Sequence, residues 1–160
     1  MKLLFTLTFI FSFQQTCFGA PHMASRFEVL SPTRLMQLEK EPCTFVHVWA
    51  TWCTSCVQEL PGLLKKLSQL KNVNPVIIDL STPFVQESFS KRYLRKLAPT
   101  FKTFFKPEIK DSTYMSALEK NWTGELPYSA VFNDGIKKKV WKGNVNPSTL
   151  TAELGKVCQR

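Results

Sequence analysis

The sequence predicts an α/β protein, a three-layer α/β/α sandwich with a mixed central sheet. Two observations predict this fold class. Apolar segments with strand character alternate with segments of helical periodicity along the 160-residue chain. The alternation then ends in two strand-like runs joined by the hairpin signal Asn133-Asp134-Gly135, with a last helix behind them. At this length we expect one domain with a sizeable core.

The N-terminal segment has the pattern of a targeting signal. A positive charge precedes the apolar run Leu3–Phe13, and small residues follow it. Such a run is too short to span a bilayer and is typical of a secretory signal peptide. We expect cleavage after Gly19, which gives a signal peptide at residues 1–19 and a mature domain at residues 20–160. A lipoprotein anchor at Cys17, or an uncleaved anchor, is the alternative. The protein is therefore expected to be exported to a periplasmic or other extracytoplasmic compartment, which is oxidising.

The elements before and around the cysteines can be read from caps and periodicity. Ser31-Pro32 is a helix start, and Glu41-Pro42 ends that helix. The run Thr44–Ala50 is almost continuously apolar, as expected for a buried central strand. A helix then begins at Cys53, and Pro61 inside it is expected to kink it. The apolar face of this helix consists of Leu60, Leu63, Leu64, Leu67 and Leu70.

The second half of the chain continues the alternation. The pattern predicts a strand, a helix, a short strand, a short helix, two hairpin strands and a final helix capped by Asn146-Pro147. The first six of these are expected at Val73–Leu80, Phe84–Leu97, Thr100–Phe105, Tyr114–Lys120, Pro127–Phe132 and Ile136–Trp141.

The most informative motif is Trp52-Cys53-Thr54-Ser55-Cys56, which connects the central strand to the following helix. A helix N-terminus carries partial positive charge and free N–H groups, and both favour a thiolate, the nucleophile in disulfide exchange. Cys53 and Cys56 are three residues apart, so they share a helix face and lie close enough to bond. We expect Cys53 to be the exposed partner and Cys56 the buried one. The motif therefore predicts a redox-active pair.

Three other uses of such a pair have weaker support. A structural zinc site needs four ligands, the remaining cysteines form no second close pair, and only His22 and His47 could add ligands. A c-type haem attachment needs a histidine after the second cysteine, where Val57 stands. A purely structural disulfide is the third alternative. The sequence predicts no metal and no cofactor.

At these residues the chain resembles a known family. The run Trp49-Ala50-Thr51-Trp52-Cys53-x-x-Cys56, followed by Glu59 and Pro61, resembles extracytoplasmic thioredoxin-like thiol-disulfide oxidoreductases of the TlpA and ResA type, including their cytochrome c maturation relatives. Leu126-Pro127 resembles the cis-proline segment of thioredoxin folds. The resemblance covers about residues 31–160. It implies a thioredoxin fold with an insertion before the cis-proline.

The resemblance and the chemistry of thiols assign roles to the residues around the pair. Cys53 is expected to attack a substrate disulfide and Cys56 to resolve the mixed disulfide. Trp52 is expected to shield the pair and to shape the docking surface; simple core packing is the alternative. Pro127 is expected opposite Cys53, where a cis peptide would expose backbone groups of Leu126 to an extended substrate. An ordinary strand-edge proline is the alternative there.

Two ionisable residues are also expected near the pair. Glu59 lies three residues after Cys56, on the inner face of the helix, where burial would raise its pKa and let it exchange a proton with Cys56. The resemblance implies such a role, and a surface glutamate is the alternative. His47 stands where thioredoxins have a buried Asp and the related reductases often Asn. A proton shuttle and a satisfied core histidine are equally supported for it.

Cys43 and Cys158 are predicted to form a second, structural disulfide, and this prediction does not come from the resemblance. Cys43 begins the central strand, whereas Cys53 follows its other end. The final helix should return to the start-of-strand edge, where it ends at Cys158. In an oxidising compartment a pair within range would bond. Two separate buried thiols are the alternative.

The sequence thus predicts a thiol-disulfide oxidoreductase that reduces disulfides in cysteine-containing substrate proteins and is supplied by a membrane-bound thiol electron donor. Two alternatives stay open: a disulfide oxidase or isomerase, and a metallochaperone-type binding module that uses the same cysteines. The net charge of +9 is interpreted as a soluble surface. The sequence contains no nucleic-acid motif, so no nucleic acid is expected as a partner, and the protein is expected to be a monomer.

Overall fold

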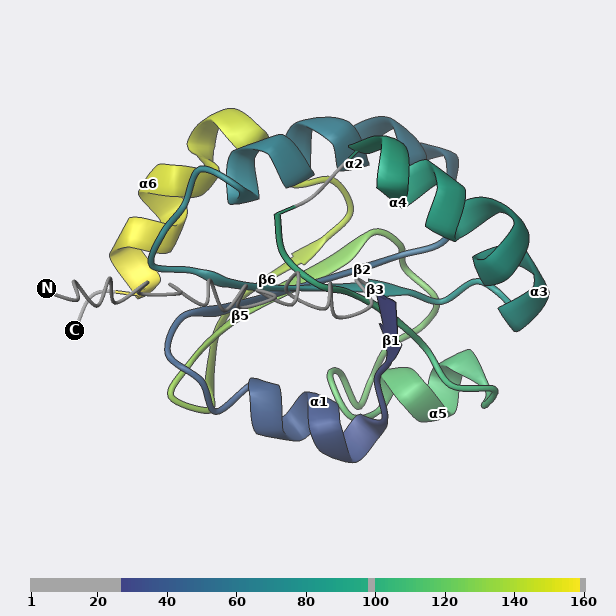
Figure 1. Ribbon diagram of the computed structural model, residues 1–160. Coiled ribbons are helices and arrows are strands. Elements are labelled where there is room, and N and C mark those ends of the chain that lie inside the picture. Colours follow the sequence, from purple (N-terminus) through teal and green to yellow (C-terminus); the bar gives the residue numbers. More distant parts are fainter. Residues whose placement is uncertain (1–26, 98–99, 159–160) are drawn as a thin grey trace, which may run out of the picture.

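The structure of the protein is a computed structural model that describes residues 27–97 and 100–158. Within these ranges the middle layer is a six-stranded sheet with the order β1-β4-β3-β2-β5-β6. Helices cover both faces of the sheet (Figure 1), which is the three-layer arrangement that the sequence predicts. The expected signal peptide, residues 1–19, and Cys17 lie outside the described residues. None of the helices in the described ranges has the length and apolar character needed to cross a membrane.

The sheet is mixed. The strands β1, β4, β3 and β2 are parallel to one another, whereas β5 is antiparallel to β2 and β6 is antiparallel to β5. The strands β2, β3 and β4 therefore end at one edge of the sheet, and β5 begins there. The bounds are β1 Phe27–Val29, β2 Thr44–Trp49, β3 Asn74–Asp79, β4 Thr103–Phe105, β5 Tyr128–Asn133 and β6 Ile136–Lys142.

The helices form the two outer layers. On one face lie α2, α4 and α6, and on the other face lie α1 and α5 (Figure 1). The short α3 and the π-helical segment η1 connect β3 to α4. The bounds are α1 Pro32–Leu38, α2 Thr54–Leu67, α3 Pro83–Val85, η1 Gln86–Ser90, α4 Lys91–Leu97, α5 Asp111–Met115 and α6 Pro147–Val157.

The central strand β2 contributes to both hydrophobic cores, because successive side chains of a strand point to opposite faces. Phe45 and Trp49 pack in the cluster that contains α2 and α6, whereas Val46 and Val48 pack in the cluster that contains α1 and α5. All of β2 is buried, which explains why apolar residues occupy both of its faces.

The proline inside α2 is accommodated by a neighbouring helix. Pro61 has no N–H group, so it cannot donate to the carbonyl of Val57 four residues earlier. The hydroxyl of Tyr93, on α4, donates to this carbonyl instead at 2.8 Å. This bond satisfies the carbonyl and joins α4 to α2, which continues past Pro61 to Leu67.

Four elements differ from the sequence-based expectation. The expected helix Phe84–Leu97 is divided into α3, η1 and α4, because a π segment interrupts the ordinary helical period. The helix expected at Tyr114–Lys120 is α5, which begins earlier, at Asp111, and ends at Met115. The strand expected from Thr100 begins at Thr103. The pattern also missed β1, since an edge strand of three residues is too short to show a period.

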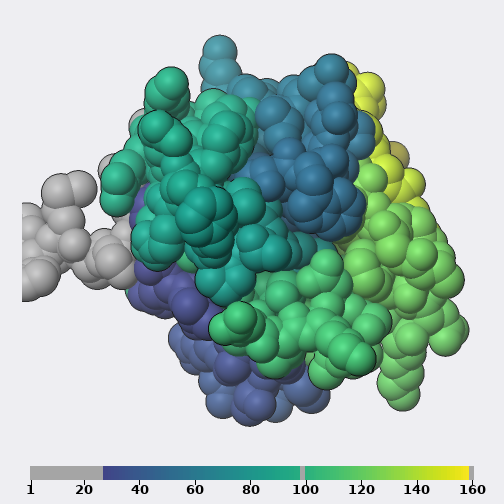
Figure 2. Space-filling model, turned by 90° about the vertical axis from the view of Figure 1, so that its right-hand side faces the viewer, coloured from purple at the N-terminus to yellow at the C-terminus, as the bar shows by residue number. Residues whose placement is uncertain are grey.

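Figure 2 views the edge of the sheet at which β2 and β3 end. The beginning of α2 (blue), the segment of α3 and η1 (teal) and the segment between β4 and β5 (green) meet on this face. The insertion expected before the cis-proline, a short strand from Thr100 and a short helix, corresponds to β4 and α5. This edge of the sheet therefore brings the beginning of α2, with Cys53 and Cys56, near the segment that ends at Pro127.

Candidate active site

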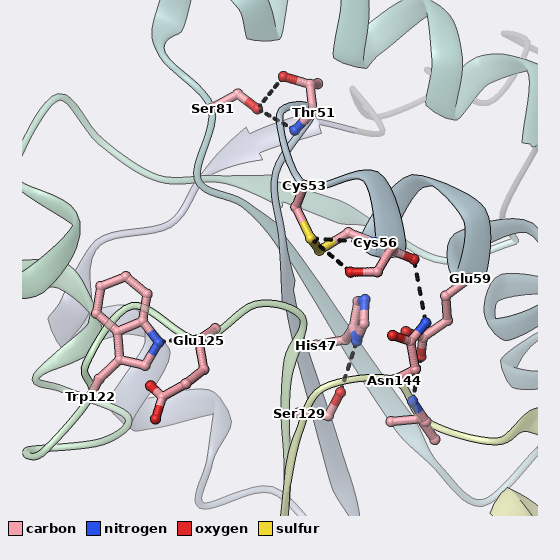
Figure 3. Close-up of a disulfide and its surroundings, with 12 residues drawn as sticks. His47, Thr51, Cys53, Cys56, Glu59, Ser81, Trp122, Glu125, Ser129 and Asn144 are labelled. Atoms are coloured by element: carbon pink, nitrogen blue, oxygen red, sulfur yellow. Dashed lines mark hydrogen bonds between the residues drawn. A yellow bond between two sulfur atoms is a disulfide. The ribbon is translucent and has the colours of Figure 1, made fainter.

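Cys53 is the N-cap of α2 and belongs to a tight turn that connects β2 to this helix. Its main-chain N–H donates to the carbonyl of Ala50 at 3.1 Å, which closes the turn. A disulfide joins Cys53 to Cys56, with 5.2 Å between their Cα atoms. The N–H of Cys56 donates to the Sγ of Cys53 at 3.2 Å (Figure 3). This N–H is one of the unpaired donors of the helix N-terminus, so the position would favour a thiolate on Cys53 after reduction.

The two cysteine residues differ in accessibility. Cys53 is 7% exposed and Cys56 is 0% exposed. The first cysteine is therefore the one that reaches the surface, but it is less exposed than the sequence alone led us to expect. Trp52, next to it in the turn, is 62% exposed, so its indole lies on the surface beside the pair and not in the core.

Glu59 is buried on the inner face of α2 and interacts with the loop that follows β6. The N–H of Val145 donates to its Oε1 at 2.8 Å. Its Oε2 is buried and has no hydrogen-bond partner among the described residues. Burial raises the pKa of the Glu59 carboxyl to about 6, although the bond from Val145 acts in the opposite direction. The same loop also contacts the first turn of α2, where Asn144 Nδ2 donates to the carbonyl of Ser55 at 3.4 Å.

His47 lies on β2, beneath the cysteine pair (Figure 3). It is fully buried, and its Nδ1 is 2.8 Å from the hydroxyl of Ser129, which is opposite it on β5. Its Nε2 is buried and has no partner within the described part of the chain. Burial lowers the pKa of His47 to about 3, so its imidazole is neutral at neutral pH.

Pro127 directly precedes β5 at the edge of the sheet where β2 ends. The Leu126–Pro127 peptide bond is cis. In the register of β2 and β5, Tyr128 pairs with Val48, so Pro127 lies at the level of the end of β2. Leu126 packs against the core clusters on both faces. In the insertion just before it, the indole N–H of Trp122 donates to the carbonyl of Glu125 at 2.9 Å (Figure 3).

The contact between Thr51, in the active-site turn, and Ser81 was not predicted from the sequence. The N–H of Thr51 donates to the hydroxyl of Ser81 at 3.0 Å, and the hydroxyls of the two residues are also 3.0 Å apart. Ser81 follows β3, the parallel neighbour of β2, so the two strand ends lie side by side. The pairing of β2 with β3 is the signal that could have found this contact, because the residues that follow two paired parallel strands lie at one edge.

The other two cysteines lie at the opposite edge of the sheet. A disulfide joins Cys43 and Cys158, with 5.1 Å between their Cα atoms. Asn133 forms hydrogen bonds next to both of these cysteines. Its Oδ1 accepts from the N–H of Cys43 at 3.3 Å, and its Nδ2 donates to the carbonyl of Val157, the neighbour of Cys158, at 3.5 Å. Across residues 27–97 and 100–158, no three His, Cys, Asp or Glu side chains are grouped so that they could bind a metal ion.

No profile of a known protein family matches the sequence, and no curated protein matches it. Solved structures do match. A thioredoxin-related protein from Neisseria meningitidis serogroup B is 25% identical, with a TM-score of 0.60 over 74% of this chain and 86% of that chain. StoA from Bacillus subtilis is 21% identical, with a TM-score of 0.53 over 71% of this chain and 82% of that chain.

A third match is a secreted Mycobacterium tuberculosis disulfide oxidoreductase that is described as homologous to E. coli DsbE. It is 16% identical, with a TM-score of 0.58 over 75% of this chain and 84% of that chain. The structural neighbours are thiol:disulfide oxidoreductases and related proteins, which is consistent with a thioredoxin-like enzyme. The chain therefore has the thioredoxin fold of these proteins, with a Cys-x-x-Cys disulfide at the beginning of its second helix.

Proposed function

We propose that the protein is an extracytoplasmic thiol-disulfide oxidoreductase that reduces disulfides in substrate proteins through Cys53 and Cys56. The observation that carries this proposal is the asymmetry of the pair. The sulfur of Cys53 is at a helix N-terminus and accepts an N–H bond, and the residue is 7% exposed, whereas Cys56 is fully buried. An attacking thiol must be both ionised and accessible, and a resolving thiol needs only to reach its partner.

The first step is nucleophilic attack by the Cys53 thiolate on one sulfur of the substrate disulfide. A bond forms between Cys53 and the substrate, the substrate S–S bond breaks, and the second substrate sulfur leaves as a thiolate. In the second step the Cys56 thiolate attacks the Sγ of Cys53. The mixed disulfide breaks, the substrate is released with both thiols reduced, and the protein retains the Cys53–Cys56 disulfide. Two electrons have then passed from the protein to the substrate.

The second step requires that Cys56 lose a proton in a buried place. Glu59 supports this step, because it lies one helical turn further along the inner face of α2 and has a buried Oε2 with no partner among the described residues. Its pKa of about 6, raised by burial, lets it exchange a proton near neutral pH. We assign His47 an indirect role. A neutral imidazole beneath the pair, whose Nε2 has no partner in the part of the chain that the structure describes, would change the relative stability of the thiol and disulfide forms.

The surface around Cys53 would receive the substrate. Trp52 is exposed beside the pair and offers a large amphipathic contact area. Pro127 lies at the same edge of the sheet and would form the opposite side of the docking surface. These two residues give the proposed enzyme a way to bind a polypeptide that presents its disulfide to Cys53.

The proposal includes export and a reducing partner. The N-terminal signal pattern and the secreted Mycobacterium tuberculosis protein of the same fold support an extracytoplasmic site of action. In an oxidising compartment the pair would stay oxidised unless a dithiol supplied electrons, so we propose a membrane-bound thiol donor. N-terminal sequencing of the exported protein tests the signal peptide, and the expected first residue is Ala20.

Reduction of insulin with dithiothreitol as the electron source tests the activity. We expect the protein to accelerate the reaction and Cys53→Ser to abolish the acceleration. The equilibrium of the pair with glutathione then gives the direction of the reaction. A potential near that of thioredoxin, about −270 mV, is expected for a reductase, whereas a value near about −120 mV would indicate an oxidase.

A further inference from the structure

Ser81 lies in a loop, but it is buried, and both its main chain and its side chain are hydrogen-bonded. It is 1% exposed and follows β3 by two residues. Its N–H donates to Oδ1 of Asp79 at 2.8 Å, and its carbonyl accepts from Nε2 of Gln86 at 2.7 Å. Asp79 is the buried last residue of β3, and Gln86 is the buried first residue of the π segment η1. The main chain of Ser81 is therefore attached both to the sheet and to the helix behind it.

The hydroxyl of Ser81 is directed at the active-site turn (Figure 3). It accepts the N–H of Thr51 at 3.0 Å and is 3.0 Å from the hydroxyl of Thr51. Thr51 is the second residue of the Ala50–Cys53 turn and lies two residues before Cys53. The turn decides where the sulfur of Cys53 is relative to the N–H of Cys56, so a fixed Thr51 also fixes this contact.

We propose that Ser81 is a positioning residue for Cys53. Through Thr51 it sets the turn that delivers the Cys53 sulfur to the N-terminus of α2. The inference rests on the proposed function, since it concerns the reactivity of the same pair. It adds a residue from the loop after β3, outside the Cys-x-x-Cys motif, that determines how well the helix N-terminus stabilises the Cys53 thiolate.

Removal of the Ser81 hydroxyl should shift the redox equilibrium of Cys53 and Cys56 in one direction. Only the reduced protein has a Cys53 thiolate, so a turn that positions the sulfur well stabilises the reduced form over the disulfide. Without the Ser81 hydroxyl the turn has more freedom, and the reduced form loses part of this stabilisation. The equilibrium constant for reduction by glutathione should then fall, and the potential of the pair should become more negative.

The test measures the redox equilibrium of full-length variants with glutathione, together with the alkylation rate of reduced Cys53 by iodoacetamide. For Ser81→Ala we expect the equilibrium constant to fall about tenfold, which is about 30 mV, and alkylation to slow. For Thr51→Val, which keeps its N–H bond and loses only the hydroxyl contact, we expect a fall of about threefold. Thr51→Val also keeps the proposal testable if Ser81→Ala fails to fold.

Thr44→Val is the matched control, because Thr44 is a buried threonine at the other end of β2. Its hydroxyl donates to the carbonyl of Leu38 at 2.9 Å. This contact is at the end of β2 opposite to Cys53 and Cys56. This variant should melt at a lower temperature and leave the equilibrium constant within about twofold of the wild type. The proposal is overturned if folded Ser81→Ala or Thr51→Val has an unchanged constant, or if Thr44→Val changes it equally.

The two proposals fail in different ways. A wild-type protein that does not reduce insulin would overturn the proposed function. The glutathione equilibrium needs no substrate protein, so it still reports whether Ser81 acts on the pair.

Discussion

The main-chain N–H of Val145 donates to Oε1 of Glu59 at 2.8 Å, which joins the loop after β6 to the buried face of the active-site helix. A carboxyl held in this way is oriented, but it is still desolvated. Its pKa is raised to about 6 by burial, so the folded state retains a proton on Glu59 that the unfolded chain has lost. The contribution of Glu59 to stability therefore falls as the pH rises from about 4.5 to about 6.

Glu59→Gln should remove this ionisation while its amide oxygen still accepts from Val145. We expect the pH–rate profile of disulfide exchange to lose its inflection near pH 6, and the stability to stop falling over the same pH range. Stopped-flow reduction of a small disulfide and urea unfolding, each measured from pH 4 to pH 8, check the two parts. Glu87→Gln, at an exposed residue paired with Lys91, is the control and should behave like the wild type. An unchanged profile for Glu59→Gln would remove Glu59 from the proton transfer.

His47→Asn tests the neutral histidine beneath the pair. Because burial lowers the pKa of His47 to about 3, the unfolded chain binds a proton below its ordinary pKa of 6.5 that the folded protein excludes. Wild-type stability should fall as the pH is lowered from 6.5 toward 3, by about 2 kcal/mol between pH 7 and pH 5 from this residue. In urea unfolding at different pH values, His47→Asn should lack the part of the pH dependence of stability that comes from His47.

The redox potential of His47→Asn separates the two interpretations of this residue. If the imidazole acts on the pair, we expect the equilibrium with glutathione to shift by more than about 10 mV, which is about 0.5 kcal/mol. A smaller shift, combined with the expected change in pH-dependent stability, would assign His47 to the core alone.

The disulfide between Cys43 and Cys158 should be structural. It closes a loop with a sequence separation of 115 at the edge of the sheet opposite the active site. Replacing both residues by alanine should lower the free energy of unfolding by about 2–5 kcal/mol and leave insulin reduction unchanged. Denaturant unfolding without reductant measures this difference. Mass spectrometry that finds both thiols free in protein from its native compartment would contradict the prediction.

Trp52→Ala should separate substrate binding from chemistry. Trp52 is 62% exposed, so its removal should change the free energy of unfolding by no more than about 0.5 kcal/mol. We expect the KM for a protein disulfide to rise about tenfold and the reduction rate of a small aromatic disulfide to stay unchanged, because only the protein needs the docking surface. Met36→Ala, at an exposed residue of α1 on the other face, is the control. Equal KM values for Trp52→Ala and the wild type would exclude this role.

The sequence predicted those parts of the fold that depend on local signals. The buried run of β2, the start of a helix at Cys53 and the hairpin at Asn133-Asp134-Gly135 each have a short-range pattern, and the structure contains the corresponding elements. The division of the helix after β3 was not predictable, because a π segment depends on tertiary contacts such as those of buried Gln86. The three-residue β1 owes its strand conformation to pairing with β4 and not to its own pattern.

The candidate site shows the same distinction. Cys53, Cys56 and Glu59 are close in the chain, so helical spacing alone was enough to bring them together. Ser81, Ser129 and Val145 reach the site from other strands and loops. Their contacts depend on strand register and loop path, for which the sequence has no local signal.

The measurement that tests the central claim most directly is the capture of a mixed disulfide by Cys56→Ser. This variant keeps the attacking thiol of Cys53 and lacks the resolving one, so the first step should proceed and the second should stop. After incubation with a disulfide-containing substrate protein, we predict a covalent complex that dithiothreitol releases and that peptide mapping assigns to Cys53. The double variant Cys53→Ser with Cys56→Ser should form none. Full turnover by Cys56→Ser, or a complex linked through Cys43 or Cys158, would contradict the two-cysteine mechanism.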